Sequence, residues 1–345
     1  MNRSQGQGAE APPPRETTAL FGHAEAERTL LAAYRGGRMP HAWLIGGPPG
    51  IGKATLAYRV ARFVLAYPDS SARDVQAAQT LALDSAHPAA RRVAAQAHPD
   101  VLTLERTAGA TGAVRSVITV DDVRRTVGFF GSTAGAGGWR VCIVDSADDL
   151  QSPQGANALL KVLEEPPSRA LFLVISHAPG RLLATIRSRC RRLTLRPLVA
   201  TDVAQAAALA LDRDPADAEV QRADRAAEGS VARATTLLGG AALAIRERTT
   251  ELLGGLPQID PQALHALGDT LGRSDDTVFN TFVETIQDWL SAQLHVKGAQ
   301  AGRLAPVAEV WEKLDRAARD VEVFNLDRKP MVFAVFGLLA ETARS

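Results

Sequence analysis

Cysteine, lysine and aromatic residues are scarce in this chain of 345 residues. Two cysteines, Cys142 and Cys190, are too few for a disulfide framework or for the paired CxxC clusters of a structural zinc site. No apolar run reaches the roughly 18–20 residues that a membrane span needs, and the first residues lack the apolar core of a signal peptide. A net charge of +1 excludes a polycation that would hold nucleic acid through bulk charge. We therefore expect a cytoplasmic protein without zinc or a membrane partner.

The composition is nevertheless that of a folded protein, because 46% of the residues are hydrophobic and 22% are charged. Residues 1–17, rich in Gln, Gly and Pro, predict a disordered tail. Strands and helices alternate over 18–198, which predicts an α/β domain: a parallel sheet with helices on both faces. Only helical patterns follow, and breaks near Gly239 and Gly240 divide them into a small helical domain, 199–240, and an all-α domain, 241–345.

One glycine-rich segment matches a phosphate-binding motif. Gly47, Pro48, Pro49, Gly50, Ile51, Gly52 and Lys53 fit the pattern GxxxxGK, and they lie between a predicted strand and a predicted helix. In such a loop, backbone N–H groups surround the phosphates and the lysine reaches the terminal ones. Only five of the 39 cationic residues are lysines, so a lysine at this place carries weight. A glycine-rich turn without a ligand is the alternative interpretation.

Two positions depart from the pattern of a magnesium-dependent ATPase. The residue after Lys53 is Ala54, whereas a Ser or Thr hydroxyl there would bind magnesium, and Thr55 comes one residue late. Asp145 ends an apolar strand, where a carboxylate reaches magnesium, but the following residue is Ser146 instead of Glu. Asp145 is open to a second interpretation as a helix N-cap. Nucleotide binding can survive these changes, while metal positioning and hydrolysis should suffer.

Three motifs together resemble the bacterial clamp-loader AAA+ subunits of DNA polymerase III. They are Gly47–Lys53, the run NALLKVLEEPP at 157–167, and the run TIRSRC at 185–190. The resemblance covers residues 21–198 well and, more loosely, implies a lid domain at 199–240 and a collar (oligomerisation) domain at 241–345. Within this family, the degraded nucleotide site is similar to that of delta-prime subunits, whereas gamma/tau motor subunits keep the hydroxyl and the Glu.

The resemblance implies a role for several residues. Arg189 of the Ser-Arg-Cys run would be an arginine finger, offered in trans to ATP on a neighbouring subunit, where its planar donors meet phosphate oxygens. Asp145 would be a Walker B residue, Ser176 a sensor 1 residue and Arg233 a sensor 2 residue. Each of the last two is equally open to an ordinary structural or surface role. The bound nucleotide would be ATP or ADP at 47–55, with magnesium in doubt.

The resemblance also implies partners. The chain would act as a stator beside gamma/tau and delta subunits, within the DNA polymerase III holoenzyme, and would meet the sliding clamp and primed DNA through that complex. Little or no intrinsic ATPase activity is expected. Two alternatives remain open: a gamma/tau-type ATPase, and a nucleotide-free scaffold in which the P-loop is a relic.

Overall fold

A computed structural model describes residues 11–108, 115–131, 138–151, 153–296 and 301–344. The chain divides into two compact units, one comprising Glu10–Thr235 and the other beginning at Thr236. This boundary falls inside helix α10 (Val231–Leu238), slightly before the boundary predicted after residue 240. The first unit contains all the motifs on which the sequence analysis depends.

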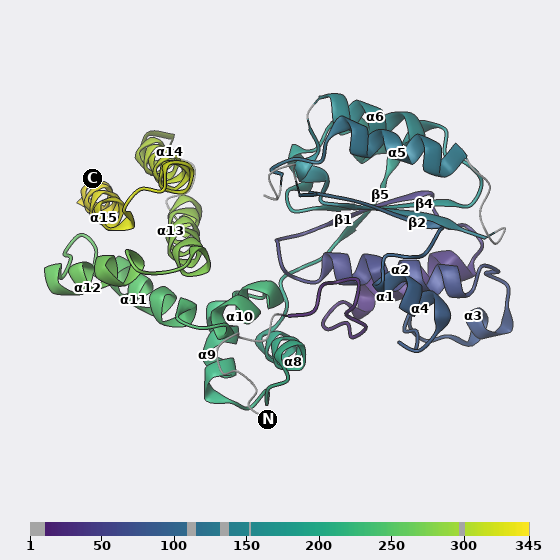
Figure 1. The fold of residues 1–345 in the computed structure, drawn as a ribbon, viewed down its shortest axis with the longest axis horizontal. Helices are drawn as coiled ribbons and strands as arrows, with labels where there is room; N and C mark the ends of the chain where they lie inside the picture. The colour runs from purple at the N-terminus through teal and green to yellow at the C-terminus, as the bar shows by residue number, and fades with distance from the viewer. Residues whose placement is uncertain (1–10, 109–114, 132–137, 152, 297–300, 345) are drawn as a thin grey trace. The chain divides into compact units, whose positions relative to one another are not determined.

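A five-stranded parallel sheet lies at the centre of the first unit (Figure 1). Its strands are β1 (Ala42–Gly46), β2 (Val101–Glu105), β3 (Arg140–Asp145), β4 (Ala170–Ser176) and β5 (Arg191–Thr194). They lie in the order β2-β3-β4-β1-β5. Gly46 pairs with Ser176 on β4 and with Thr194 on β5, so these strands end at the same edge. The P-loop begins at this edge, where ligands bind in open α/β sheets.

Helices cover both faces of the sheet (Figure 1). On one face lie α1 (Ala24–Arg35), α2 (Lys53–Ala66) and α4 (Pro88–Ala94), with α3 (Arg73–Ala77) nearby; on the other lie α5 (Val120–Gly131) and α6 (Gln154–Glu164). The strands alternate accordingly, because Trp43 and Ile45 pack on the α1–α2 side and Leu44 on the α5–α6 side. This burial on both faces explains the continuous apolar strands and confirms the predicted α/β sheet.

Three short helices follow the last strand; two lie inside this unit, and the third crosses its boundary at Thr235. They are α8 (Ala200–Leu211), α9 (Ala218–Ala226) and α10; they lie in the range 199–240, and a separate domain there stays a prediction, because α8 and α9 belong to the same compact unit as the sheet. The backbone of Gly229, which has a φ of 85°, sits so close to Pro197 and Leu198 that a Cβ there would lie 2.5 Å from Pro197 Cβ. This contact ties the start of α10 to the chain that leaves the sheet.

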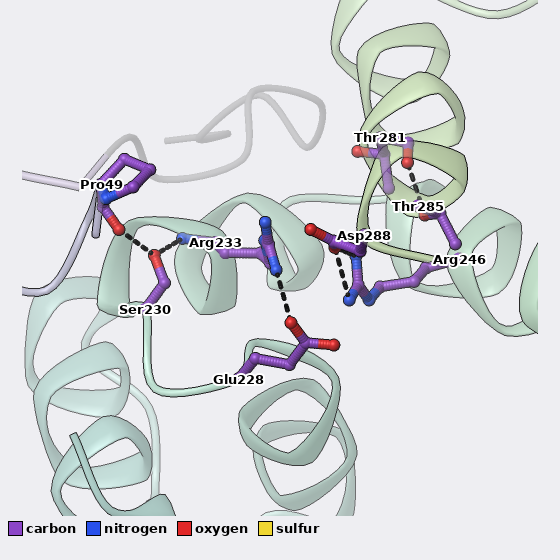
Figure 2. Close-up of polar contacts among 8 residues, drawn as sticks. All are labelled: Pro49, Glu228, Ser230, Arg233, Arg246, Thr281, Thr285 and Asp288. Carbon is purple, nitrogen blue, oxygen red and sulfur yellow. Dashed lines mark hydrogen bonds and ion pairs between the residues drawn. The ribbon is translucent and has the colours of Figure 1, made fainter. Parts of the chain in front are cut away.

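The second unit is helical in its described part, as predicted. Its helices are α11 (Ala242–Gly254), α12 (Pro261–Leu271), α13 (Asp276–Val296), α14 (Ala301–Phe324) and α15 (Arg328–Arg344). Phe279, Phe282, Ile286 and Phe336 lie in one buried cluster that joins α13 to α15. Buried Arg246 donates through both Nη atoms to Asp288 at 3.1 Å, so α11 and α13 are also joined by a charged pair (Figure 2). In the described residues, no helix is long and apolar enough to cross a membrane.

Two local features differ from the sequence-based expectations. The TIRSRC run, which carried no predicted element, forms most of a short helix, α7 (Ala184–Arg189). Of the predicted tail, residues 1–10 lie outside the described residues, whereas 11–17 are placed against α2. There Glu16 and Thr17 donate backbone hydrogen bonds to the Pro13 carbonyl and form a turn.

Candidate functional site

The glycine-rich segment Gly47–Lys53 follows β1 directly and leads into α2. Gly50 and Gly52 have φ angles of 76° and 97°, in the left-handed region that strains residues with a Cβ. A Cβ at Gly50 would also lie 2.1 Å from Ser230 Oγ. Glycine is therefore required at position 50 by its own backbone and by its neighbour.

Lys53 is folded over the loop that precedes it. Its side chain is 3% exposed, and Nζ donates to the carbonyls of Gly47 at 2.7 Å and Pro48 at 2.5 Å. Burial lowers the pKa of Lys53 to about 8, and the nearby carboxylates of Asp145 and Asp148 oppose this change. At neutral pH the ammonium stays largely protonated, so the loop holds a cation close to its backbone.

The start of α10 is hydrogen-bonded to the same loop. Ser230 Oγ donates to the Pro49 carbonyl at 3.2 Å, and the Ala232 N–H donates to the Gly50 carbonyl at 3.2 Å. Figure 2 shows the Ser230 hydroxyl between the Pro49 carbonyl and the backbone nitrogen of Arg233, which donates to it at 3.3 Å. These bonds connect the start of α10 to the P-loop.

A buried histidine reaches the loop from a third direction. His23 Nε2 lies 2.6 Å from the Ile51 carbonyl, and because a carbonyl only accepts, this nitrogen carries the proton. Burial lowers the pKa of His23, which favours the neutral ring. Five consecutive carbonyls, from Gly47 to Ile51, thus each accept a hydrogen bond. Their bonding stabilises the one loop conformation that a phosphate would meet.

The first turn of α2 supplies the donors of this site. The N–H groups of Lys53, Ala54 and Thr55 have no acceptor within their own helix, because the first intrahelical bond runs from Leu56 N–H to the Gly52 carbonyl. Unpaired N–H groups and the helix dipole favour an anion at this end. The local geometry is therefore that of a phosphate site.

A cavity of about 530 Å³ lies against this helix end. It is lined by Gly50–Thr55, by N-terminal residues including Pro12 and Thr17, and by Leu209 of α8 and Val231 of α10. Its volume falls within the roughly 300–1,000 Å³ that is typical of small-ligand sites. The cavity joins the polar P-loop to apolar walls, as a nucleotide with a charged tail and an apolar base requires.

Asp145 lies at the end of β3 and also lines this cavity. Burial raises the pKa of Asp145 to about 6; Glu105 adds to the rise and Lys53 opposes it. The short turn that follows, η1 (Ala147–Asp149), has Ser146 and not Asp145 at its N-cap position. The structure therefore does not support the interpretation of Asp145 as a helix cap.

The metal-binding potential of the site is limited. Ala54 and Thr55 both line the cavity, but only Thr55 has a hydroxyl. Within the described ranges, no group of three or more His, Cys, Asp or Glu side chains could hold a metal ion. Glu16 and Asp145 both line the cavity, and of these two carboxylates Asp145 is the one that acts on Lys53, so a magnesium ion there would depend largely on phosphate and water oxygens.

Ser176 is fully buried and already has a partner. Its Oγ donates to Asp148 at 3.0 Å, and the same carboxylate accepts the N–H groups of His177 at 2.6 Å and Ala178 at 3.1 Å. Ser176 is not among the described residues that line the cavity, although its neighbours Ile175 and His177 are. Its role as sensor 1 stays a prediction.

Arg189 lies at the end of α7, on the surface of the unit. Its side chain is 34% exposed. One Nη donates to the Thr185 carbonyl at 3.0 Å, and the other lies 2.6 Å from Glu164 Oε1 at the end of α6. Both partners come from the motifs that carried the resemblance, NALLKVLEEPP and TIRSRC. Arg189 is thus held within its own chain and is accessible to a neighbour.

Arg233, the predicted sensor 2 residue, points elsewhere in this structure. One of its Nη atoms lies 3.3 Å from Glu228 Oε2 (Figure 2). Arg233 is not among the described residues that line the cavity, whereas Val231, Ala232 and Thr235 of the same helix are. A role in nucleotide contact stays a prediction and would require the Arg233 side chain to turn.

Several residues of the site carried no signal in the sequence. His23 and Ser230 bond to the P-loop from segments far away in the chain, and Asp148 binds the end of β4. None of them belongs to a motif with a fixed spacing from Gly47–Lys53. Only the fold reveals their proximity: His23 lies at the start of α1, Ser230 directly before α10 and Asp148 just after β3.

Comparisons with known proteins agree with the resemblance. The delta-prime subunit of DNA polymerase III from Pseudomonas aeruginosa is 40% identical over 160 residues, covering 45% of this chain and 43% of that protein. The delta-prime subunit from Escherichia coli K12 is 36% identical over 168 residues, covering 49% and 46%. The match thus spans less than half the length of these relatives. A gamma/tau subunit from Mycobacterium tuberculosis is 29% identical over 187 residues, covering 54% and 29%.

Solved structures show a weaker similarity. A DNA polymerase III gamma subunit-related protein from Thermotoga maritima superimposes with a TM-score of 0.45 at 17% identity, over 91% of this chain and 100% of that one. The family model described as "DNA polymerase III, delta subunit" matches residues 22–199, which are 178 of the 345 residues. The matched part includes the P-loop, Asp145, Ser176 and Arg189. The chain therefore belongs to the DNA polymerase III delta-subunit family.

Proposed function

We propose that this chain is a delta-prime-type subunit of the DNA polymerase III clamp loader, with an incomplete ATPase site of its own and an arginine finger for a neighbour. The observation that carries the proposal is the pairing of these two features in one unit. The P-loop is intact but Ala54 and Ser146 lack the groups that bind magnesium and polarise water. Arg189, in contrast, is partly exposed at the surface, and its guanidinium is the group that a finger requires.

Its own site would bind ATP or ADP without rapid hydrolysis. The N–H groups at the start of α2 and the Lys53 ammonium would hold the phosphates, while Asp145 would meet any magnesium ion through its carboxylate. Ser176 supports slow hydrolysis in this proposal, because its hydroxyl is bonded to Asp148 and must leave that partner before it can orient a water molecule. A bound nucleotide would then serve mainly to stabilise the unit.

Arg189 would act in trans on ATP that is bound by a gamma/tau subunit. A planar guanidinium stabilises the charge that builds on the phosphate oxygens, and such fingers contribute about 10³–10⁵ to the rate in GTPase systems. Residues 18–198 would form the nucleotide-binding domain, 199–240 the lid and 241–345 the collar. The collar would join the gamma/tau and delta subunits, and the complex would meet the sliding clamp and primed DNA in the cytoplasm.

ATP hydrolysis by the purified chain, alone and with its cognate gamma/tau and delta subunits, tests the proposal. We expect turnover by the chain alone to be far below about one per second, at the low end of the enzyme range. We expect co-purification with the other subunits and hydrolysis only in the complex. Turnover near one per second that Lys53→Ala abolishes would instead indicate a gamma/tau-type ATPase. A chain that joins the complex but binds no ATP or ADP up to millimolar concentration would be a nucleotide-free scaffold.

A further inference from the structure

Arg62, on α2, is a buried cation that plays no part in the site described so far. Its side chain is 2% exposed. One Nη donates to the Arg15 carbonyl at 3.0 Å and the other to the Thr17 carbonyl at 2.7 Å. Within the described residues no ion pair of Arg62 is found, so its partners are backbone oxygens of the N-terminal segment.

This arrangement has an energetic cost that an apolar side chain would avoid. Burial lowers the pKa of Arg62 to about 10, with a further contribution from the neighbouring cation of Arg59. A buried charge without a counterion is unfavourable unless its hydrogen bonds are well made. The planar guanidinium spans two carbonyls that lie two residues apart, which no neutral side chain of similar volume could do. In return for the unfavourable burial of its charge, Arg62 holds residues 15–17 in a fixed position.

A second arginine continues the contact along the same segment. Arg59, one turn before Arg62 on α2, donates to the Thr18 carbonyl at 2.5 Å and to Glu27 at 2.6 Å. Glu27 also accepts the N–H of Leu81 at 2.8 Å. Three carbonyls between Arg15 and Thr18 are thus held by two side chains of the helix that begins at the P-loop lysine.

The segment that these arginines hold is a wall of the cavity. Pro12, Pro14, Thr17 and Thr18 line it, and so do Leu209 and Ala210 of α8. The other end of the cavity is formed by Gly50–Thr55, where phosphates would bind. The phosphate end depends on the P-loop, and the apolar end depends on the placement of residues 11–18.

We propose that Arg62 is a positioning residue for the nucleoside half of the bound nucleotide: it fixes the N-terminal segment as a wall for the base and sugar. This inference rests on the proposed nucleotide binding at the P-loop. It predicts different effects on the two halves of the nucleotide, because Arg62 stabilises the wall for the nucleoside and leaves the phosphate site unchanged. Inorganic tripolyphosphate probes the phosphate end alone, whereas ADP probes the phosphate end and the nucleoside end together.

Calorimetric titration of the full chain with ADP and with tripolyphosphate tests this separation. We expect Arg62→Met, which keeps most of the buried volume but removes the donors, to weaken ADP binding about tenfold or more. Binding of tripolyphosphate should change less than about twofold. Arg28→Met, at an exposed position of α1, is the matched control and should leave both affinities unchanged. Equal loss for both ligands, or loss for neither, would overturn the proposal.

Arg62→Lys guards against a variant that fails to fold. It keeps the charge but cannot span both carbonyls with one planar group, so an intermediate loss of ADP affinity is expected. Trypsin provides a second readout, since cleavage after Arg15 requires the segment to leave α2. We expect Arg62→Lys to accelerate this cleavage and ADP to slow it in the unaltered chain. If ADP binds but gives no protection at Arg15, the segment is not a wall of the nucleotide site.

The two levels of failure can be told apart. An unaltered chain that binds neither ADP nor tripolyphosphate would refute the proposed nucleotide site itself, and with it the role of Arg62. An unaltered chain that binds both, with Arg62 variants that affect both equally, would refute the positioning role alone.

Discussion

The P-loop and the segment around Arg189 belong to the same unit but are held in different ways. Pro48 and Pro49 of the P-loop are exposed, yet its five carbonyls from Gly47 to Ile51 all accept hydrogen bonds, and the donors come from three separate parts of the chain. Arg189 is half-exposed and is held by one carbonyl and one surface carboxylate. The first arrangement fixes a backbone around a ligand, while the second keeps a side chain in reach of another molecule.

The energetics of the two regions differ in the same sense. A buried hydrogen bond contributes about 0.5–1.5 kcal/mol, and leaving one buried partner unsatisfied costs about 1–3 kcal/mol. A surface ion pair such as that of Arg189 and Glu164 contributes only about 0–1 kcal/mol. A change of the loop conformation would therefore require a large free energy, whereas Arg189 could leave Glu164 for a phosphate with only a small change in free energy. This difference is what the proposed roles require: a fixed loop for a bound ligand and a loosely held side chain for a contact in trans.

Replacement of Arg189 by Ala should have the largest effect, because it removes the proposed finger. We expect ATP hydrolysis by the reconstituted complex to fall about 10³-fold or more, with no loss of assembly in size-exclusion chromatography. Arg192→Ala, at an exposed position three residues further on, is the control and should keep hydrolysis within about twofold. An Arg189→Ala complex with unchanged hydrolysis would remove this residue from the mechanism.

Lys53→Ala should have the next largest effect, and it tests the P-loop. Loss of a charge-assisted bond to phosphate, worth about 1.5–3 kcal/mol, weakens binding about 10- to 150-fold. Fluorescence titration with a labelled ADP measures this change in the isolated chain. Lys161→Ala, an exposed lysine on α6, should bind ADP normally. If Lys53→Ala binds as tightly as the unaltered chain, nucleotide does not use the P-loop.

The two regions were also unequally predictable. Gly47–Lys53 was found from sequence because its chemistry is local: glycines, a lysine and a helix start at fixed spacing. The alternation of strands and helices over 18–198 predicts the parallel sheet, and the glycine-rich segment is predicted to lead into a helix, which is α2. The contacts of the P-loop with His23 and Ser230 could not be predicted, because they join segments that meet only through the fold. The bond of Ser176 to Asp148 likewise depends on the adjacency of β3 and β4.

The N-terminal segment shows the same limit from another side. Its composition, rich in Pro and Gly, resembles that of a mobile tail, and composition alone gave residues 11–17 no partner. The partner on α2 is Arg62, which holds Arg15 and Thr17, and Arg59 holds Thr18 next to them; sequence periodicity would place both arginines as ordinary helix residues. A buried charge is visible only when the packing around it is known.

The pH dependence of ADP binding should show a moderate effect at the P-loop. The ammonium of Lys53, with a pKa of about 8, loses its proton as pH rises through that value. Phosphate affinity depends on this charge, so we expect it to fall above pH 8, by up to about tenfold per unit. Lys53→Ala should show no such fall. An unaltered chain with constant affinity from pH 7 to 10 would contradict the contact.

The acid side of the same profile sharpens the role of Asp145. Burial raises the pKa of Asp145 to about 6, so its carboxylate is lost as pH falls through that value. If Asp145 holds magnesium, ADP affinity with magnesium should fall below pH 6. Without magnesium, affinity should be constant or rise, because a negative charge near the phosphates is removed. The same profile with and without magnesium would exclude Asp145 as a metal ligand.

Glu164→Gln should have the smallest effect, and it tests the contact that holds the Arg189 side chain. If Arg189 is the proposed finger, Glu164 competes with phosphate for its guanidinium, and a neutral amide would compete less well. Because a surface ion pair contributes only about 0–1 kcal/mol, we expect hydrolysis by the complex to rise, by no more than about fivefold. The adjacent exposed Glu165→Gln is the control and should leave the rate unchanged. A tenfold fall with Glu164→Gln would show instead that this carboxylate holds the Arg189 side chain in its productive orientation, so that the Arg189 contact is as constrained as the P-loop.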